Sequence, residues 1–104
     1  MRCRGVRGAT TVDSNTRDGI LAATKELLQQ MVDANGVELD EIACIFFTTT
    51  HDLNAEFPAA AVREMGWPPI PLLCAHEMNV SGALCKCLRL LMLCNTERKA
   101  KEMV

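Results

Sequence analysis

Tyrosine is absent from this sequence, and three phenylalanines and one tryptophan are the only aromatic residues among 104. The formal net charge is −2, and the lysines and arginines form no long basic run. Proteins that bind nucleic acid usually carry a basic patch, and many stack bases on aromatic rings. The sequence therefore argues against a nucleic-acid partner. It predicts a core built from aliphatic side chains, methionine and cysteine.

Long hydrophobic runs are also missing. No apolar segment approaches the roughly 20 residues that a membrane-spanning helix needs. The first ten residues, MRCRGVRGAT, lack the apolar centre of a signal peptide. From these two absences we expect a cytoplasmic protein with no membrane partner.

A C-x-x-C pair is the third missing feature. The six cysteines are scattered over positions 3, 44, 74, 85, 87 and 94. Without paired spacing, neither a disulfide framework nor a tetrahedral zinc site is expected. Cys85 and Cys87 leave a thiol redox or zinc protein open as a minor alternative. Free cysteine behaves as a small hydrophobic residue, so we expect most of these thiols to be buried, and we predict no metal and no cofactor.

The length and the apolar content predict a single domain over residues 1–104. Hydrophobic residues make up 49% of the chain. In so short a chain this content leaves apolar surface that oligomerisation could bury. We therefore expect an oligomer.

Periodicity and capping residues predict the elements of the first half. Residues 4–12 favour a strand, with two glycines where neighbouring backbone or a ligand could come close. Apolar residues at helical spacing between the capping cluster at 13–16 and Asn35-Gly36 predict a helix. Residues 42–50 favour a central strand buried on both faces. A shorter helix is expected to begin at Pro58 and to end at Gly66.

The second half contains one ambiguous segment. Residues 70–74 predict a strand, and a turn is expected at Ser81-Gly82. Residues 87–94 are good helix formers, but the segment is short, so the pattern leaves helix and strand open. A final helical piece is expected over residues 97–103, capped by Asn95-Thr96.

A single charge inside an apolar run gives the strongest functional signal. Arg89 is preceded by Leu88 and followed by four apolar residues, where an unpaired charge would be costly to bury. Glu77, just past the 70–74 strand, is the simplest partner. On these residues alone, a buried salt bridge between two segments is the favoured interpretation, with a ligand site as the alternative. His51, beside Asp52, is interpreted as a solvated or locally bonded residue.

Three segments together resemble one enzyme family. RGVRGATTV, FPAAAVREMGW and PLLCAHEMNVSG followed by KCLRLLM are similar in order and spacing to the small trimeric class of chorismate mutase, the AroH class. The resemblance implies an α+β fold with a mixed β-sheet and helices packed on it, ferredoxin-like topology, and a homotrimer forming a pseudo-α/β-barrel. It also implies that residues 87–94 form a strand, against their helical propensity.

The family's site residues have counterparts in this chain. By resemblance, Arg7 holds a substrate carboxylate, Glu77 bonds the ring hydroxyl, and Cys74 contributes near Glu77. Arg89 faces the side-chain carboxylate and the ether oxygen of the substrate. The neighbouring subunit supplies two further substrate-binding residues, Phe57 and Arg63. Catalysis is assigned to Arg89, Glu77 and Arg7.

The implied reaction is the rearrangement of chorismate to prephenate in aromatic amino acid biosynthesis, a branch of the shikimate pathway. This isomerase reaction is intramolecular and needs no nucleophile, metal or cofactor. The family pattern differs at Ala60, where some members have lysine. It also continues with a further strand, a tyrosine and a tail. Either this sequence omits this C-terminal part, or this variant lacks part of its site lid and the final strand. The alternative is a trimeric module that binds small acids or processes imines in intersubunit clefts without mutase activity.

Overall fold

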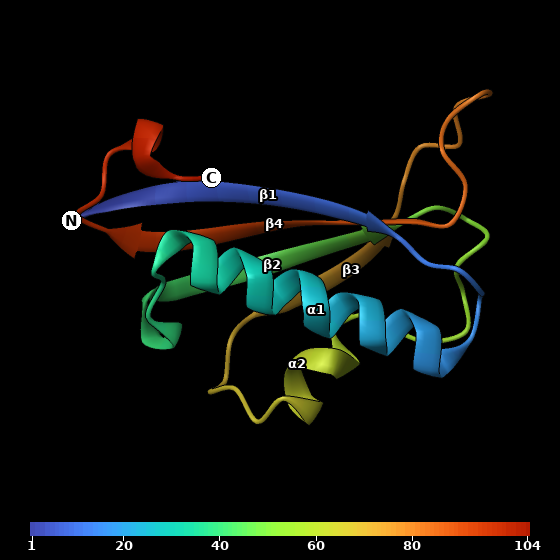
Figure 1. Cartoon of the computed structure of the whole chain (residues 1–104), viewed down its shortest axis with the longest axis horizontal. Helices are drawn as coiled ribbons and strands as arrows, with labels where there is room; N and C mark the ends of the chain where they lie inside the picture. Colours follow the sequence, from blue (N-terminus) through green and yellow to red (C-terminus); the bar gives the residue numbers. More distant parts are fainter.

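Four strands form one mixed sheet in the computed structural model, which describes all residues from Met1 to Val104. The elements in chain order are β1 (Arg2–Thr11), α1 (Arg17–Asn35), β2 (Ile42–Thr49), α2 (Ala60–Glu64), β3 (Leu72–His76) and β4 (Cys87–Thr96), with 3-10 turns at Leu39–Glu41 and Ala100–Glu102. The strand order is β1-β4-β2-β3 (Figure 1). β4 runs antiparallel to β1 and β2, and β3 runs parallel to β2.

The α+β prediction is confirmed, but the expected ferredoxin-like topology is wrong. In that topology the elements follow the order β-α-β-β-α-β, whereas here α2 lies between β2 and β3 and the last two elements are both strands. The crossover from β2 to β3 explains the difference. A parallel neighbour requires a long connection, and the segment containing α2 supplies it.

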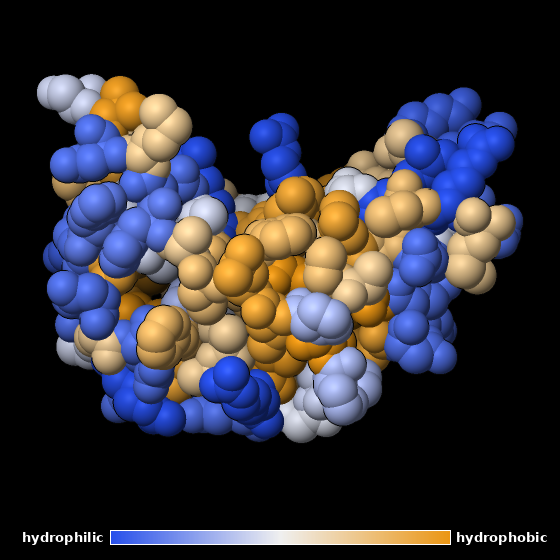
Figure 2. All heavy atoms as spheres, turned by 180° about the vertical axis from the view of Figure 1, so that it is seen from behind, coloured by the Kyte–Doolittle hydropathy of each residue, from blue (hydrophilic) through white to orange (hydrophobic).

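The two helices cover only one face of the sheet (Figure 1). Side chains of β2 therefore alternate: Ile45 and Phe47 point to the helices and are buried, whereas Phe46 on the opposite face is 37% exposed. The central position of β2 is confirmed, but its predicted burial on both faces is wrong for the single chain. Seen from behind, the uncovered face carries a broad patch of apolar atoms (Figure 2). We call it the open face.

Helix α1 begins and ends where the capping residues predict. The Thr16 hydroxyl accepts a hydrogen bond from the Gly19 N–H (3.0 Å). Gly36 adopts a left-handed conformation, with φ of 59°, and closes the last turn. The helix packs so closely on β1 that a Cβ atom at Gly8 would lie 2.6 Å from the Met31 sulfur. The close neighbours of Gly8 are side chains of α1, whereas the prediction named backbone or a ligand. No helix is both long and apolar enough to cross a membrane.

Residues 87–96 form strand β4 against their helical propensity, as the family resemblance implied. β4 lies between β1 and β2, so both of its edges are hydrogen-bonded, and alternate residues from Leu88 to Cys94 are buried. Tertiary packing overrides propensity here. The predicted helix over residues 97–103 is wrong, because Asn95 and Thr96 pair with β1 instead of capping a helix. Only the 3-10 turn remains.

The connection from β2 to β3 also follows the prediction with shifted boundaries. α2 begins at Ala60, two residues after Pro58, and Gly66 has the positive φ (71°) of a residue just past a helix end. β3 begins at Leu72 and ends at His76, so Glu77 directly follows the strand, as predicted. Glu64 joins α2 to α1 through ion pairs with Arg17 and Lys25, each 2.7 Å long. The hydrogen bonds from Lys25 and Arg17 lower the pKa of Glu64.

Candidate active site

The open face contains a cavity of about 530 Å³ between β1, β4, β2 and the segment after β3. Arg7, Glu77 and Arg89 all line it. The sheet register explains this arrangement: Arg89 pairs with Ala9 of β1 on one side and with Thr48 of β2 on the other. Arg7 lies two residues before Ala9 and therefore on the same face. The structure thus brings together three of the predicted site residues.

Glu77 and Arg89 form a loose ion pair. The Arg89 Nε atom lies 3.7 Å from Glu77 Oε1, and the two side chains are 54% and 27% exposed. Arg89 is therefore not buried in this chain, so its predicted burial is wrong, although the predicted pairing with Glu77 is correct. The pKa of Arg89 is raised, first by the Cys87 side chain and then by the charge of Glu77.

Thr48 belongs to this cavity, and the sequence analysis did not identify it. Its hydroxyl donates a hydrogen bond of 2.5 Å to Glu77 Oε1. The backbone of Glu77 is also held, because its N–H donates to the Thr49 carbonyl (2.8 Å). His51 Nε2 lies 3.1 Å from the Glu77 carbonyl oxygen, so His51 is locally bonded, in keeping with its predicted role.

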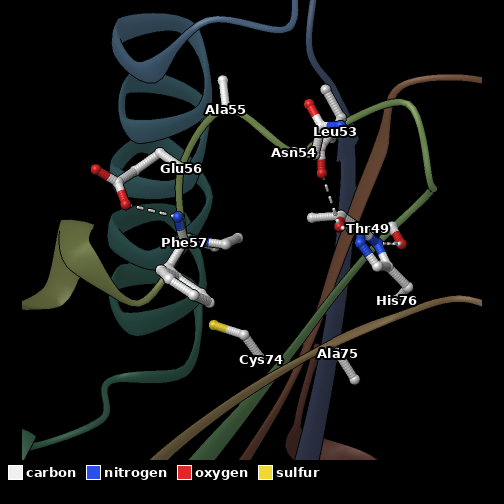
Figure 3. A pocket seen from close by; sticks show the side chains of 10 residues that line it. Thr49, Leu53, Asn54, Ala55, Glu56, Phe57, Cys74, Ala75 and His76 are labelled. Atoms are coloured by element: carbon white, nitrogen blue, oxygen red, sulfur yellow. Dashed lines mark hydrogen bonds between the residues drawn. The ribbon is translucent and has the colours of Figure 1, made fainter.

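Cys74 lies elsewhere. It pairs with Phe47, whose side chain faces the helices, and it lines a second cavity of about 360 Å³ on that side. Figure 3 shows its thiol pointing toward the ring of Phe57. Burial raises the pKa of the Cys74 thiol. Although Cys74 precedes Glu77 by only three residues, the structure does not bring its side chain into the open-face cavity.

Phe57 and Arg63 also lie outside the cavity that contains Arg7, Glu77 and Arg89. Phe57 is 68% exposed at the edge of the second cavity. Arg63 is exposed on α2 and lines a separate hollow with Trp67. Within one chain, therefore, neither side chain reaches Arg7, Glu77 or Arg89, although Phe57 shares the second cavity with Cys74.

The open-face cavity combines two guanidinium groups and one carboxylate with apolar walls, including Phe46, Leu84 and Leu91. Guanidinium groups can bind a carboxylate through two parallel hydrogen bonds. No group of three His, Cys, Asp or Glu side chains with metal-binding geometry occurs in the structure. The arrangement suits a small polar anion whose ring or alkyl part rests on the apolar wall.

Comparisons with known proteins agree on one family. The model of the family described as chorismate mutase type I matches residues 3–104. A Bacillus subtilis (strain 168) protein described as chorismate mutase AroH is 43% identical over 98 residues, which are 93% of this chain and 77% of that protein. A Thermus thermophilus protein of the same description is 46% identical over 95 residues, 90% of this chain and 78% of that protein. The solved structure of a chorismate mutase from Clostridium thermocellum superposes with a TM-score of 0.94 at 48% identity, covering 96% of this chain and 89% of that one.

Proposed function

The chain belongs to the chorismate mutase type I family and is a chorismate mutase, and on this premise we propose that Arg7, Glu77 and Arg89 bind chorismate and catalyse its rearrangement. The observation that carries the proposal is the single cavity that contains all three side chains. Two cations match the two carboxylates of the substrate, and one carboxylate matches its ring hydroxyl. The reaction converts chorismate to prephenate in aromatic amino acid biosynthesis.

The chemistry explains why so few polar groups suffice. A [3,3] rearrangement breaks a C–O bond and forms a C–C bond within one molecule, so the enzyme must hold the flexible substrate in a compact, reactive conformation. As the C–O bond breaks, negative charge grows on the ether oxygen and positive charge on the ring. A guanidinium aimed at that oxygen stabilises the transition state more than the substrate.

Each charged residue then has a distinct role. Arg89 contacts the side-chain carboxylate and the ether oxygen together, because its planar guanidinium presents several donors. Glu77 accepts the hydrogen bond of the ring hydroxyl and offsets the positive charge of the ring. Arg7, across the cavity on β1, holds a substrate carboxylate.

We also propose that the active unit is a homotrimer. Its first support is the apolar open face, where Leu73 is 59% and Phe46 37% exposed; apolar patches of this kind commonly mark interfaces. The second support is that Phe57 and Arg63 do not line the cavity that contains Arg7, Glu77 and Arg89 of their own chain, which leaves them available to a neighbouring site. In the trimer, Phe57 lines the neighbour's pocket and Arg63 adds positive charge to it.

Cys74 has a minor role in this proposal. Its thiol faces the helices, and burial raises its pKa, so it remains protonated at neutral pH and acts as a weak hydrogen-bond partner at most. All six cysteines are free thiols, which suits the reducing cytoplasm that we propose as the location. Residues 1–104 are proposed to form one domain. The alternative of a binding or imine-processing module is not supported by the family, the relatives or the structural neighbour.

The direct test is the loss of chorismate absorbance on addition of the purified protein, measured together with its mass by light scattering. We expect chorismate to disappear and prephenate to form, at a particle mass of three chains. Chorismate that remains unchanged would contradict the activity. Full activity in a particle of one chain would contradict the intersubunit roles of Phe57 and Arg63 while leaving the activity in place.

A further inference from the structure

The roles proposed for Arg7, Glu77 and Arg89 leave open what holds the Glu77 carboxylate in place. The hydroxyl of Thr48 contacts that carboxylate. Thr48 lies on β2, between Ala75 of β3 and Arg89 of β4. We propose that Thr48 is the positioning residue of the active site, which holds the Glu77 carboxylate away from the Arg89 guanidinium so that both groups face the substrate. This inference rests on the proposed roles of Glu77 and Arg89.

The two oxygens of the Glu77 carboxylate are used differently. Oε1 accepts a hydrogen bond of 2.5 Å from the Thr48 hydroxyl and is also the oxygen nearest to Arg89. The 3.7 Å separation from Arg89 Nε exceeds the length of a hydrogen bond. One oxygen is therefore fixed by a neutral donor, and Oε2 is left to accept a hydrogen bond from the ring hydroxyl. The donors of Arg89 are left for the substrate.

Without this hydroxyl the site has a competing arrangement. An arginine and a carboxylate favour a close pair with two parallel hydrogen bonds, and Glu77 and Arg89 are near enough to form one by side-chain rotation. Such a pair would occupy the donors that bind the substrate carboxylate and would turn Glu77 away from the ring. Thr48 prevents it by giving Oε1 a partner at 2.5 Å, a shorter contact than the 3.7 Å to Arg89 Nε.

The groups that carry this contact are themselves well fixed. Thr48 is in the interior of the sheet, with paired strands on both sides, and its branched Cβ restricts its rotamers. The Glu77 N–H is bonded to the Thr49 carbonyl at 2.8 Å. Two anchored backbones therefore define the position of one carboxylate, which is the kind of support a preorganised site requires.

The test compares Thr48→Val with Thr48→Ser in chorismate kinetics. Valine keeps the shape and the strand propensity but removes the donor, so we expect kcat/KM to fall about ten- to a hundredfold, the range for a hydrogen bond to a charged group. Serine restores the donor, and we expect it to stay within about threefold of the parent, since it lacks only the methyl group that restricts the rotamer. Thr11→Val is the matched control, because Thr11 is an exposed threonine of the same sheet outside the cavity, and it should keep parental kinetics.

The double variant Thr48→Val with Glu77→Ala separates the possible outcomes. If Thr48 acts through Glu77, adding Thr48→Val to Glu77→Ala changes kcat/KM no further; an equal loss in both backgrounds overturns the proposal. Glu77→Ala with parental turnover would overturn the site assignment itself. A large loss for Glu77→Ala with parental kinetics for Thr48→Val would overturn the role of Thr48 alone. If Thr48→Val melts early, the serine variant decides: a well-folded Thr48→Ser that is as slow as Glu77→Ala contradicts the proposal.

Discussion

Replacement of Arg89 by lysine separates a catalytic arginine from one that supports the fold. Arg89 is 54% exposed on the open face, and its contact with Glu77 is 3.7 Å long. Exposed ion pairs of this kind add little to stability, so Arg89→Lys should melt within about 3 °C of the parent. The same change removes the planar set of donors that can reach a carboxylate and the ether oxygen together.

The expected loss of turnover is large because the second contact exists only in the transition state. Loss of one well-placed donor to a developing oxyanion slows other enzymes roughly a hundred- to a thousandfold, and we expect a similar fall in kcat, with a smaller change in KM because lysine keeps the charge. Thermal unfolding and chorismate turnover should be measured on the same preparation. Early melting with parental turnover per folded molecule would refute the catalytic role of Arg89.

Three further predictions concern other parts of the chain. Cys74→Ser should keep turnover within about threefold, because the reaction needs no thiolate; a loss of more than tenfold in the chorismate assay would favour thiol chemistry. Leu73→Asp should give a folded particle of one chain by light scattering, because a charge on the open face would have to be buried in the trimer; a stable trimer would contradict the proposed interface. Asp52 accepts the Lys86 N–H with both carboxylate oxygens, at 3.1 and 2.9 Å, and hydrogen bonds from Thr50 and then Lys86 lower its pKa below the ordinary 3.8. Because the pKa is lower in the folded state, ionised Asp52 stabilises the protein above the ordinary pKa of 3.8, and this contribution is lost as the pH falls through the folded-state pKa. Asp52→Asn should therefore lessen the fall in melting temperature between about pH 5 and pH 3. An unchanged fall would show that Asp52 does not contribute.

The features that could be predicted from the sequence are mostly local. Thr16 and Gly36 define the ends of α1 through contacts within a few residues, so their side-chain chemistry suffices. The meeting of Glu77 and Arg89 was also predicted, because a charge in an apolar run requires an anionic partner. The predicted burial of Arg89 is wrong, because the helices leave the open face uncovered and Arg89 lies on it.

The features that were missed depend on strand register. Thr48 contacts Glu77 across 29 residues of sequence, and only the pairing of β2 with β3 and β4 shows that they meet. The same register turns Cys74 toward the helices, which spacing from Glu77 alone could not reveal. β4 needed the family resemblance, because its propensity favours a helix and its burial between β1 and β2 decides otherwise.

The most direct test of an active site shared between subunits is a mixing experiment with two inactive variants. Arg89→Ala removes a residue of the cavity, and Arg63→Ala removes the residue proposed to come from the neighbour. If equal amounts assemble at random into trimers, about one site in four receives an intact residue from each chain, because each of the two chains has an even chance of being the right one. We predict that the co-assembled sample recovers about a quarter of the parental turnover of chorismate, whereas each variant alone remains inactive. A sample that forms mixed trimers but recovers no turnover would contradict the account.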